Sequence, residues 1–187
     1  MLFLKHPLTT SAIAVLMFVS YSTHANAEGC SGYELAGDIL QIAIPATAYA
    51  STFYMKDSEG RAQFYKSFFT NLGITYTLKY AIDKQRPENH GYQSFPSGHT
   101  SAAFQGASFI HKRYGWKYAL PAYLGATYVG WSRMEGESDK HDIIDVIAGA
   151  GIGIASSFIF TKPYDNGVQV TPVATSNFWG ITFSKKW

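Results

Sequence analysis

Hydrophobic positions recur at helical spacing through most of the chain and change to alternation only near its end. The segments 35–54, 59–84, 99–112, 116–133 and 141–160 are predicted to be helical. In the second segment one stripe is formed by Phe64, Phe68, Leu72 and Thr75. Pro45 lies inside the first segment, where we expect it to bend the helix. The pattern predicts an all-α body, a bundle of about five helices.

Turn-forming residues separate these segments, and the chain changes character after Pro163. Residues 85–98 contain two prolines, two glycines and Asn89, which predicts a loop, and a second, polar loop is expected over 135–140. Beyond residue 167, apolar residues alternate with Thr, Ser and Asn in two short runs. This alternation predicts a β-hairpin. We therefore expect a helical domain over 28–166 and a short C-terminal β-like extension over 167–187.

The first 27 residues have the layout of a secretory signal peptide. Lys5 provides a positive start, residues 12–19 are apolar, and Ala25-Asn26-Ala27 has the small-x-small pattern of a cleavage site. The alternative is an uncleaved membrane anchor, but the uncharged run over 7–23 is shorter than the roughly 20 residues that a bilayer requires. The predicted location is outside the cytoplasm, in a bacterial periplasm.

Composition narrows the function classes. The 187 residues carry a net charge of +2, which argues against a nucleic-acid partner, because such proteins normally have a basic patch. Charged residues make up 15% of the chain, compared with about 25% in an average soluble domain. Cys30 is the single cysteine, so an intramolecular disulfide and a multi-cysteine zinc site are both excluded.

The low charge also raises the question of membrane contact. The three longest charge-free runs of the body, 39–55, 118–132 and 146–161, are shorter than a comfortable membrane span and contain polar residues. The core helices of a soluble bundle explain these runs equally well. Our interpretation is a periplasmic bundle that contacts the membrane.

Candidate chemistry begins with the sequence Pro96-Ser97-Gly98-His99, which leads into a predicted helix. A turn of this kind leaves free backbone N–H groups at the positive end of the helix dipole, where anions bind. Gly98 permits close approach of the backbone to a ligand, and His99 is placed to donate a proton to a leaving oxygen. A serine-capped helix with an exposed histidine explains the same residues without a function.

A second histidine lies near the start of the last predicted helix. His141 and Asp145 are four residues apart and should face the same way if both are helical. A carboxylate bonded to one ring nitrogen fixes the tautomer and leaves the other nitrogen as a nucleophile. A surface ion pair is the alternative, although the apolar run that follows Asp145 favours an inward-facing helix.

Three cations complete the set, namely Lys79, Arg86 and Arg133. Arginine offers a planar fork to two oxygens of a tetrahedral anion, and lysine offers a point charge. Each cation alone is an ordinary surface residue. Together with the two histidines, they make phosphoryl transfer the leading interpretation.

Three ordered motifs between residues 79 and 149 resemble the type 2 phosphatidic acid phosphatase superfamily. Its pattern, K-x6-RP, PSGH and SR-x5-H-x3-D, is matched by Lys79-x6-Arg86-Pro87, by Pro96 to His99, and by His141-x3-Asp145. In one departure, seven residues separate Arg133 from His141 where the family has five. The two extra residues fall in the polar loop, so the position of Arg133 is the least constrained of the motif residues.

The resemblance implies a helical, metal-free phosphatase without a cofactor that works through a phosphohistidine. His141 would be the nucleophile, Asp145 its orienting partner, and His99 the acid that protonates the leaving group. The remaining motif residues would bind the phosphate: Lys79, Arg86, Ser97, Gly98 and Arg133. The expected partner is a phosphorylated substrate, a lipid phosphate or an isoprenoid diphosphate, because the chain is rich in aromatic residues and has a predicted export signal.

Three other functions are weighed against this one. Vanadium-dependent haloperoxidases belong to the same superfamily but are generally much larger proteins. A non-catalytic protein that binds phosphate or a lipid headgroup would need the cations, but it has no use for a His141–Asp145 pair beside His99. A metal hydrolase is disfavoured because the chain has no HExxH-type spacing.

Overall fold

The computed structural model describes residues 32–89, 91–136, 140–165, 168–175 and 178–185. The predicted signal peptide over 1–27 and Cys30 therefore lie outside the described residues. Five long helices and one two-stranded antiparallel sheet are described, which confirms the predicted all-α class. They are α2 (Gly32–Tyr54), α3 (Ser58–Ile82), α4 (Gly98–Tyr114), α5 (Trp116–Glu135), α6 (Ile143–Phe160), β1 (Val168–Thr175) and β2 (Phe178–Lys185), with a short 3-10 helix at Pro87–Asn89.

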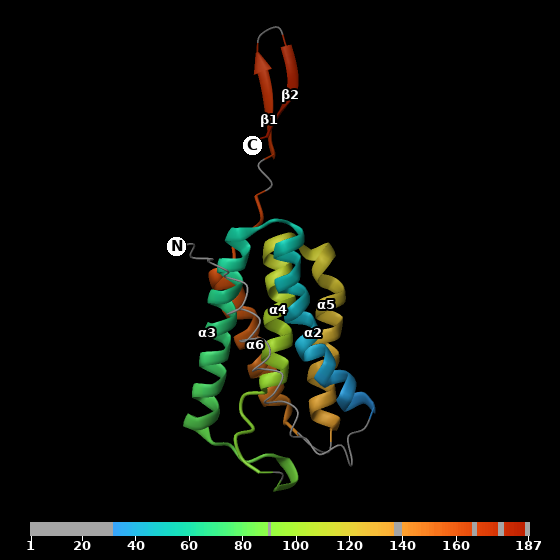
Figure 1. Ribbon diagram of the computed structural model, residues 1–187, viewed down its shortest axis with the longest axis vertical. Coiled ribbons are helices and arrows are strands. Elements are labelled where there is room, and N and C mark those ends of the chain that lie inside the picture. Colours follow the sequence, from blue (N-terminus) through green and yellow to red (C-terminus); the bar gives the residue numbers. More distant parts are fainter. Residues whose placement is uncertain (1–31, 90, 137–139, 166–167, 176–177, 186–187) are drawn as a thin grey trace, which may run out of the picture.

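Helix α4 lies at the centre of the bundle and is surrounded by the other four long helices (Figure 1). Small and polar residues make this close packing possible, because they let neighbouring backbones approach. At Gly106, for example, an added Cβ would lie 2.7 Å from the backbone of Pro45, where α2 crosses α4. The predicted stripe of α3 faces the core, with Phe64 buried against Phe109 and Phe68 partly buried beside it.

The last helix begins later than the sequence pattern predicts. It starts at Ile143, with Asp142 as the N-cap, so His141 precedes the helix and does not belong to it. The reason is local: the backbone N–H of Asp142 donates to Asp145 Oδ2 (3.2 Å), a contact that ends the loop and begins the helix. His141 and Asp145 nevertheless lie side by side, with Nδ1 of the ring 3.5 Å from Asp145 Oδ2.

A buried ion pair joins three helices at the end of the bundle nearest the hairpin. Arg113 of α4 contacts Asp57, the N-cap of α3, through Nη2 and Oδ1 (2.6 Å) and through Nε and Oδ2 (2.7 Å). Its Nη1 also donates to the carbonyl oxygens of Lys162 and Pro163, just after α6. Arg113 thus ties the start of α3 and the end of α6 to the central helix.

The predicted hairpin forms, with Val170 opposite Phe183 and Val173 opposite Gly180. It projects beyond the helices, away from the loop that joins α3 to α4 (Figure 1). The predicted domain boundary at 166/167 lies outside the described residues and stays a prediction.

We expect a protein truncated after Asp165 to keep its activity, because the hairpin contributes no motif residue. The matched control is truncation after Phe160, which also removes the carbonyl groups that Arg113 contacts. This shorter protein should unfold more readily, since a buried guanidinium would lose hydrogen-bond partners. Phosphate release and thermal unfolding of the two proteins check the prediction. Folded but inactive protein after the first cut would show that the hairpin shapes the site.

Candidate active site

The Pro96-Ser97-Gly98-His99 turn caps α4 and docks on the start of α6. Ser97 is the N-cap of α4, and its side chain accepts a hydrogen bond from the hydroxyl of Thr100 (3.0 Å). Its backbone N–H donates to the carbonyl oxygen of Asp145 (2.9 Å). Gly149 is required for this contact, because an added Cβ would lie 2.4 Å from the Ser97 carbonyl oxygen. The predicted anion-binding turn is thereby fixed beside Asp145 of α6 and beside His141, which precedes that helix.

The ring of His141 is held on one side by two groups. Nδ1 lies 3.5 Å from Asp145 Oδ2 and 3.3 Å from Ser94 Oγ. The Ser94 hydroxyl donates its own proton to Asp145 Oδ2 in a short hydrogen bond, so its oxygen is left to accept from Nδ1. The proton therefore belongs on Nδ1, and Nε2 carries the lone pair. This arrangement is the orientation that nucleophilic attack by Nε2 requires.

The carboxylate of Asp145 is fully buried and remains charged because its surroundings compensate for burial. Burial alone would raise the pKa of Asp145, but hydrogen bonds from His141, Lys84 and Ser94 outweigh it and hold that pKa well below its usual range. The strongest charge partner is Lys84, whose Nζ lies 2.7 Å from Asp145 Oδ1 and 2.8 Å from Asp142 Oδ2.

Lys84 is itself stabilised as a cation. Burial lowers its pKa, but the hydrogen bonds to Asp142 and Asp145 outweigh this effect, so the pKa of Lys84 is raised. The pair therefore stays ionised over the physiological pH range, and Asp145 can orient His141 as a carboxylate.

Two of the predicted phosphate ligands also organise the loop between α3 and α4. Lys79 Nζ donates to the carbonyl oxygen of Gln93 (2.8 Å), and Arg86 Nε donates to that of Tyr92 (3.3 Å). Arg86 Nη1 lies 3.4 Å from His141 Nε2. The guanidinium thus stands directly beside the nitrogen that would attack phosphorus.

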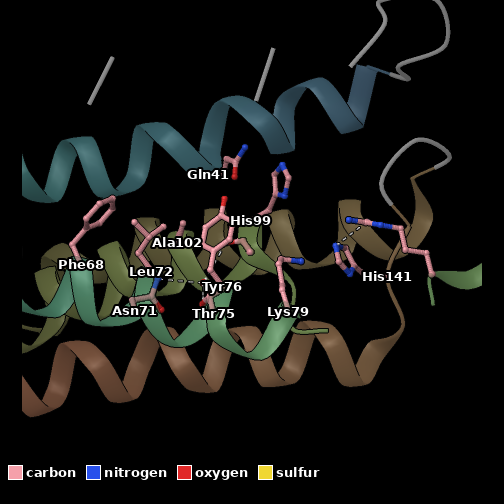
Figure 2. Close-up of a pocket in the computed structure, with 13 residues that line it drawn as sticks. Gln41, Phe68, Asn71, Leu72, Thr75, Tyr76, Lys79, His99, Ala102 and His141 are labelled. Carbon is pink, nitrogen blue, oxygen red and sulfur yellow. Dashed lines mark hydrogen bonds between the residues drawn. The ribbon is translucent and has the colours of Figure 1, made fainter. Parts of the chain in front are cut away.

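A cavity of about 130 Å³ opens between α2, α3 and α4, next to His141 Nε2. This is similar in size to an engineered cavity that binds benzene, so it accommodates a phosphoryl group and the atoms next to it. Figure 2 shows Lys79 and His99 between His141 and the inner part of the cavity. Five of the predicted site residues line it: Lys79, Arg86, Gly98, His99 and His141.

The other three predicted residues stand behind this lining. Asp145 supports His141, and Ser97 shapes the turn. Arg133 is 1% exposed, and its guanidinium faces α2: Nη2 donates to the carbonyl oxygen of Glu34 (2.9 Å), and Nη1 lies 3.0 Å from Asp38 Oδ1. The Arg133 carbonyl accepts the backbone N–H of His141 (2.9 Å). The backbone of Arg133 therefore positions His141, and its side chain does not line the cavity.

Sequence reasoning missed Ser94, Lys84 and Asp38. Ser94 was one residue of a predicted loop, and nothing in its surroundings marked it. Lys84 lies inside the K-x6-RP spacing but is not one of the residues that define it. Asp38 did carry a signal, because a charged side chain in an apolar helix is costly to bury without a purpose.

Three comparisons connect the chain to known proteins. The model of the PAP2 superfamily matches residues 63–167, more than half of the chain. A lipid A 4'-phosphatase of Helicobacter pylori is 29% identical over 86% of this chain and 88% of its own length. A lipid A 1-phosphatase of Porphyromonas gingivalis is 35% identical, over 53% of this chain and 24% of its own length. The crystal structure of Aquifex aeolicus LpxE has a similar fold, with a TM-score of 0.54 and 21% identity over 83% of this chain and 87% of that one.

Proposed function

The chain belongs to the PAP2 superfamily and is a phosphatase, and from this premise we propose that it dephosphorylates a lipid phosphate through a phosphohistidine at His141. The relatives named lipid A phosphatases favour lipid A as the substrate. One observation carries the mechanism: Nδ1 of His141 is held by Ser94 and Asp145, while Nε2 lies at the cavity beside Arg86.

In the first step, Nε2 of His141 attacks phosphorus and the bond from phosphorus to the lipid oxygen breaks. The leaving oxygen takes a proton from His99, and the charge on the phosphoryl oxygens is stabilised by Lys79, Arg86 and the N–H groups at the start of α4. In the second step, water attacks phosphorus, the P–N bond breaks, and His99 receives a proton from the water. Asp145 stays ionised throughout and holds the imidazolium that forms between the steps.

We also propose that the sides of the bundle contact lipid. The residues buried in the described structure are more often polar than apolar, whereas many large apolar side chains face outward. Helix α6 is apolar and long enough to cross a membrane, and only 28% of it is buried. This distribution is the reverse of that in an ordinary soluble bundle. The outward side chains lie on all four helices around α4 and include Leu35, Ile39, Phe69, Tyr80, Leu124, Ile147 and Ile159.

Export directed by the predicted signal peptide over 1–27 would place the catalytic end of this lipid-contacting bundle on the periplasmic side of the membrane. A lipid phosphate in the outer leaflet of the inner membrane would then be within reach of the catalytic end. Cell fractionation and the N-terminal sequence of the mature protein test this part of the proposal. A chain recovered in the cytoplasm with residues 1–27 still attached would contradict it.

The experiment that tests the function is phosphate release from lipid A, a polyprenyl diphosphate, phosphatidic acid and a nucleotide. We expect turnover of lipid phosphates, no effect of a chelator, and inhibition by vanadate, which imitates the five-coordinate transition state. Arg86→Ala should weaken vanadate inhibition by about 2–4 kcal/mol, as for loss of an oxyanion-hole donor. Arg133→Ala should weaken it less, because its side chain contacts α2. Activity lost with the chelator, or no vanadate inhibition, would exclude the mechanism.

A further inference from the structure

Helix α2 presents a polar stripe to the active site although most of its residues are apolar. Glu34, Asp38 and Gln41 lie on one face of the helix, at spacings of four and three residues. All three are buried or half-buried, and Gln41 lines the cavity. Between them, Gly37 permits close approach, because an added Cβ would lie 2.2 Å from Ser132 Oγ and 2.9 Å from Arg133 Nη2. This helix precedes the segment that the superfamily model matches.

A single oxygen of Asp38 stands between two of the predicted site residues. Asp38 Oδ1 lies 3.0 Å from Arg133 Nη1 and 3.3 Å from His99 Nε2. His99 comes from the start of α4 and Arg133 from the end of α5, so the carboxylate joins three helices at one point. Its side chain is 30% exposed, whereas that of Arg133 is 2% exposed.

We propose that Asp38 is a positioning residue of the reaction, which holds His99 in the orientation that protonates the leaving oxygen and holds Arg133 against α2. The proposal rests on the proposed function. With Nε2 of His99 facing Asp38, the ring nitrogen left for the leaving oxygen is Nδ1. As a general acid the ring carries a proton on each nitrogen, and the Asp38 carboxylate, 3.3 Å from Nε2, is placed to accept the proton there.

The proposed role is confined to one transfer of a proton. As the bond from phosphorus to the lipid oxygen breaks, the proton on His99 Nδ1 passes to that oxygen, and the ring becomes neutral. Asp38 neither gains nor loses a proton in this step. Its effect should therefore depend on how much the leaving oxygen needs protonation, being large for an alkyl phosphate and small for an activated aryl phosphate.

The test compares two substrates, a lipid phosphate with an alkyl leaving group and p-nitrophenyl phosphate. Asp38→Asn removes the charge and keeps the shape. We expect kcat on the alkyl phosphate to fall by about 10²-fold, the low end for loss of general acid catalysis, and kcat on the aryl ester to change far less. The ratio of the two rates is independent of the folded fraction, so partial unfolding of the variant does not blur the result.

Two further variants complete the design. Asp38→Asn combined with His99→Ala should be no slower than His99→Ala alone, because both remove the same proton transfer. Asp83→Asn is the control, because it makes the same charge change on an exposed residue. Asp83 has a left-handed backbone conformation, which asparagine also tolerates.

Three results would overturn the role of Asp38. Equal losses on both substrates would show a purely structural residue. A lower KM with unchanged kcat would show that the carboxylate only competes with phosphate. Additive losses in the double variant would show that Asp38 acts apart from His99. If the wild-type protein turned over neither ester, the proposed function itself would fail, and the role of Asp38 with it.

Discussion

Replacement of His141 by alanine is expected to lower phosphate release by about 10⁴-fold or more, the usual scale for loss of a covalent nucleophile. No other side chain that lines the cavity has its lone pair so placed: His99 faces Asp38, and Lys79 and Arg86 are cationic. The residual rate should come from binding and electrostatic stabilisation alone. The effect should be the same for alkyl and aryl esters, because the attack on phosphorus itself is lost.

The covalent intermediate provides the direct measurement. Wild-type protein mixed with substrate and quenched in alkali should carry phosphate on a histidine in peptides that contain residue 141, and this label should be lost in acid. His141→Ala should carry none. His111→Gln is the control, because His111 is hydrogen-bonded to Tyr123 and lies outside the cavity. Label found elsewhere in the wild-type protein, or turnover retained without His141, would exclude this nucleophile.

Replacement of Arg113 by alanine is expected to lower the free energy of unfolding by about 3–5 kcal/mol, the cost of breaking a buried ion pair by removing one partner. Arg113 is 3% exposed and Asp57 is 4% exposed, so the buried carboxylate left behind would lose its cation and keep, among the described residues, only the Gly60 N–H and the Tyr114 hydroxyl as donors. The substitution also removes the hydrogen-bond donor to the carbonyl oxygens of Lys162 and Pro163, which follow α6. Denaturant unfolding at neutral pH measures the difference, with the exposed Lys66→Ala as the charge-matched control.

Acid should reduce the difference in the free energy of unfolding between the wild-type protein and Arg113→Ala. Burial alone would raise the pKa of Asp57, but hydrogen bonds from Arg113, the Gly60 N–H and Tyr114 outweigh it, so the pKa is lowered. A carboxyl group with a lowered pKa in the folded state stabilises the protein above its unfolded pKa of about 4, and this contribution is lost as the pH falls further. Wild type and Arg113→Ala should therefore converge in stability below about pH 4. A constant difference across that range would show that Asp57 is not the relevant partner.

The helices were predictable because their boundaries depend on local chemistry. Ser97 caps α4, and Gly115 separates α4 from α5, and both signals are visible in the sequence. The predicted start of α6 at His141 was two residues too early. Asp142, the next residue, is the N-cap, so the first helical turn begins at Ile143. An apolar pattern specifies which face is buried, but the capping contacts decide where the helix begins.

The site was predictable where a motif residue touches the cavity and less so behind it. Ser94 meets His141 only because the loop folds back, with its backbone N–H donating to the carbonyl oxygen of Lys84 (2.8 Å). Arg133 shows the opposite case: its motif was recognised, but its side chain turns to Asp38 of a helix almost a hundred residues earlier. Contacts between distant segments of this kind have no periodicity or spacing in the sequence.

The five long helices of the described structure run through the bundle once each, so α2 begins and α6 finishes at opposite ends of the bundle (Figure 1). Helix α2 begins at the end of the bundle where Glu34 and Asp38 contact Arg133, and α6 ends at the opposite end, beside the hairpin (Figure 1). A fusion partner or affinity tag attached after the hairpin should therefore stay clear of bound substrate. The same geometry allows the orientation of the protein in a membrane to be measured. A protease that cleaves the hairpin approaches from the side opposite to the one where catalysis is proposed to take place.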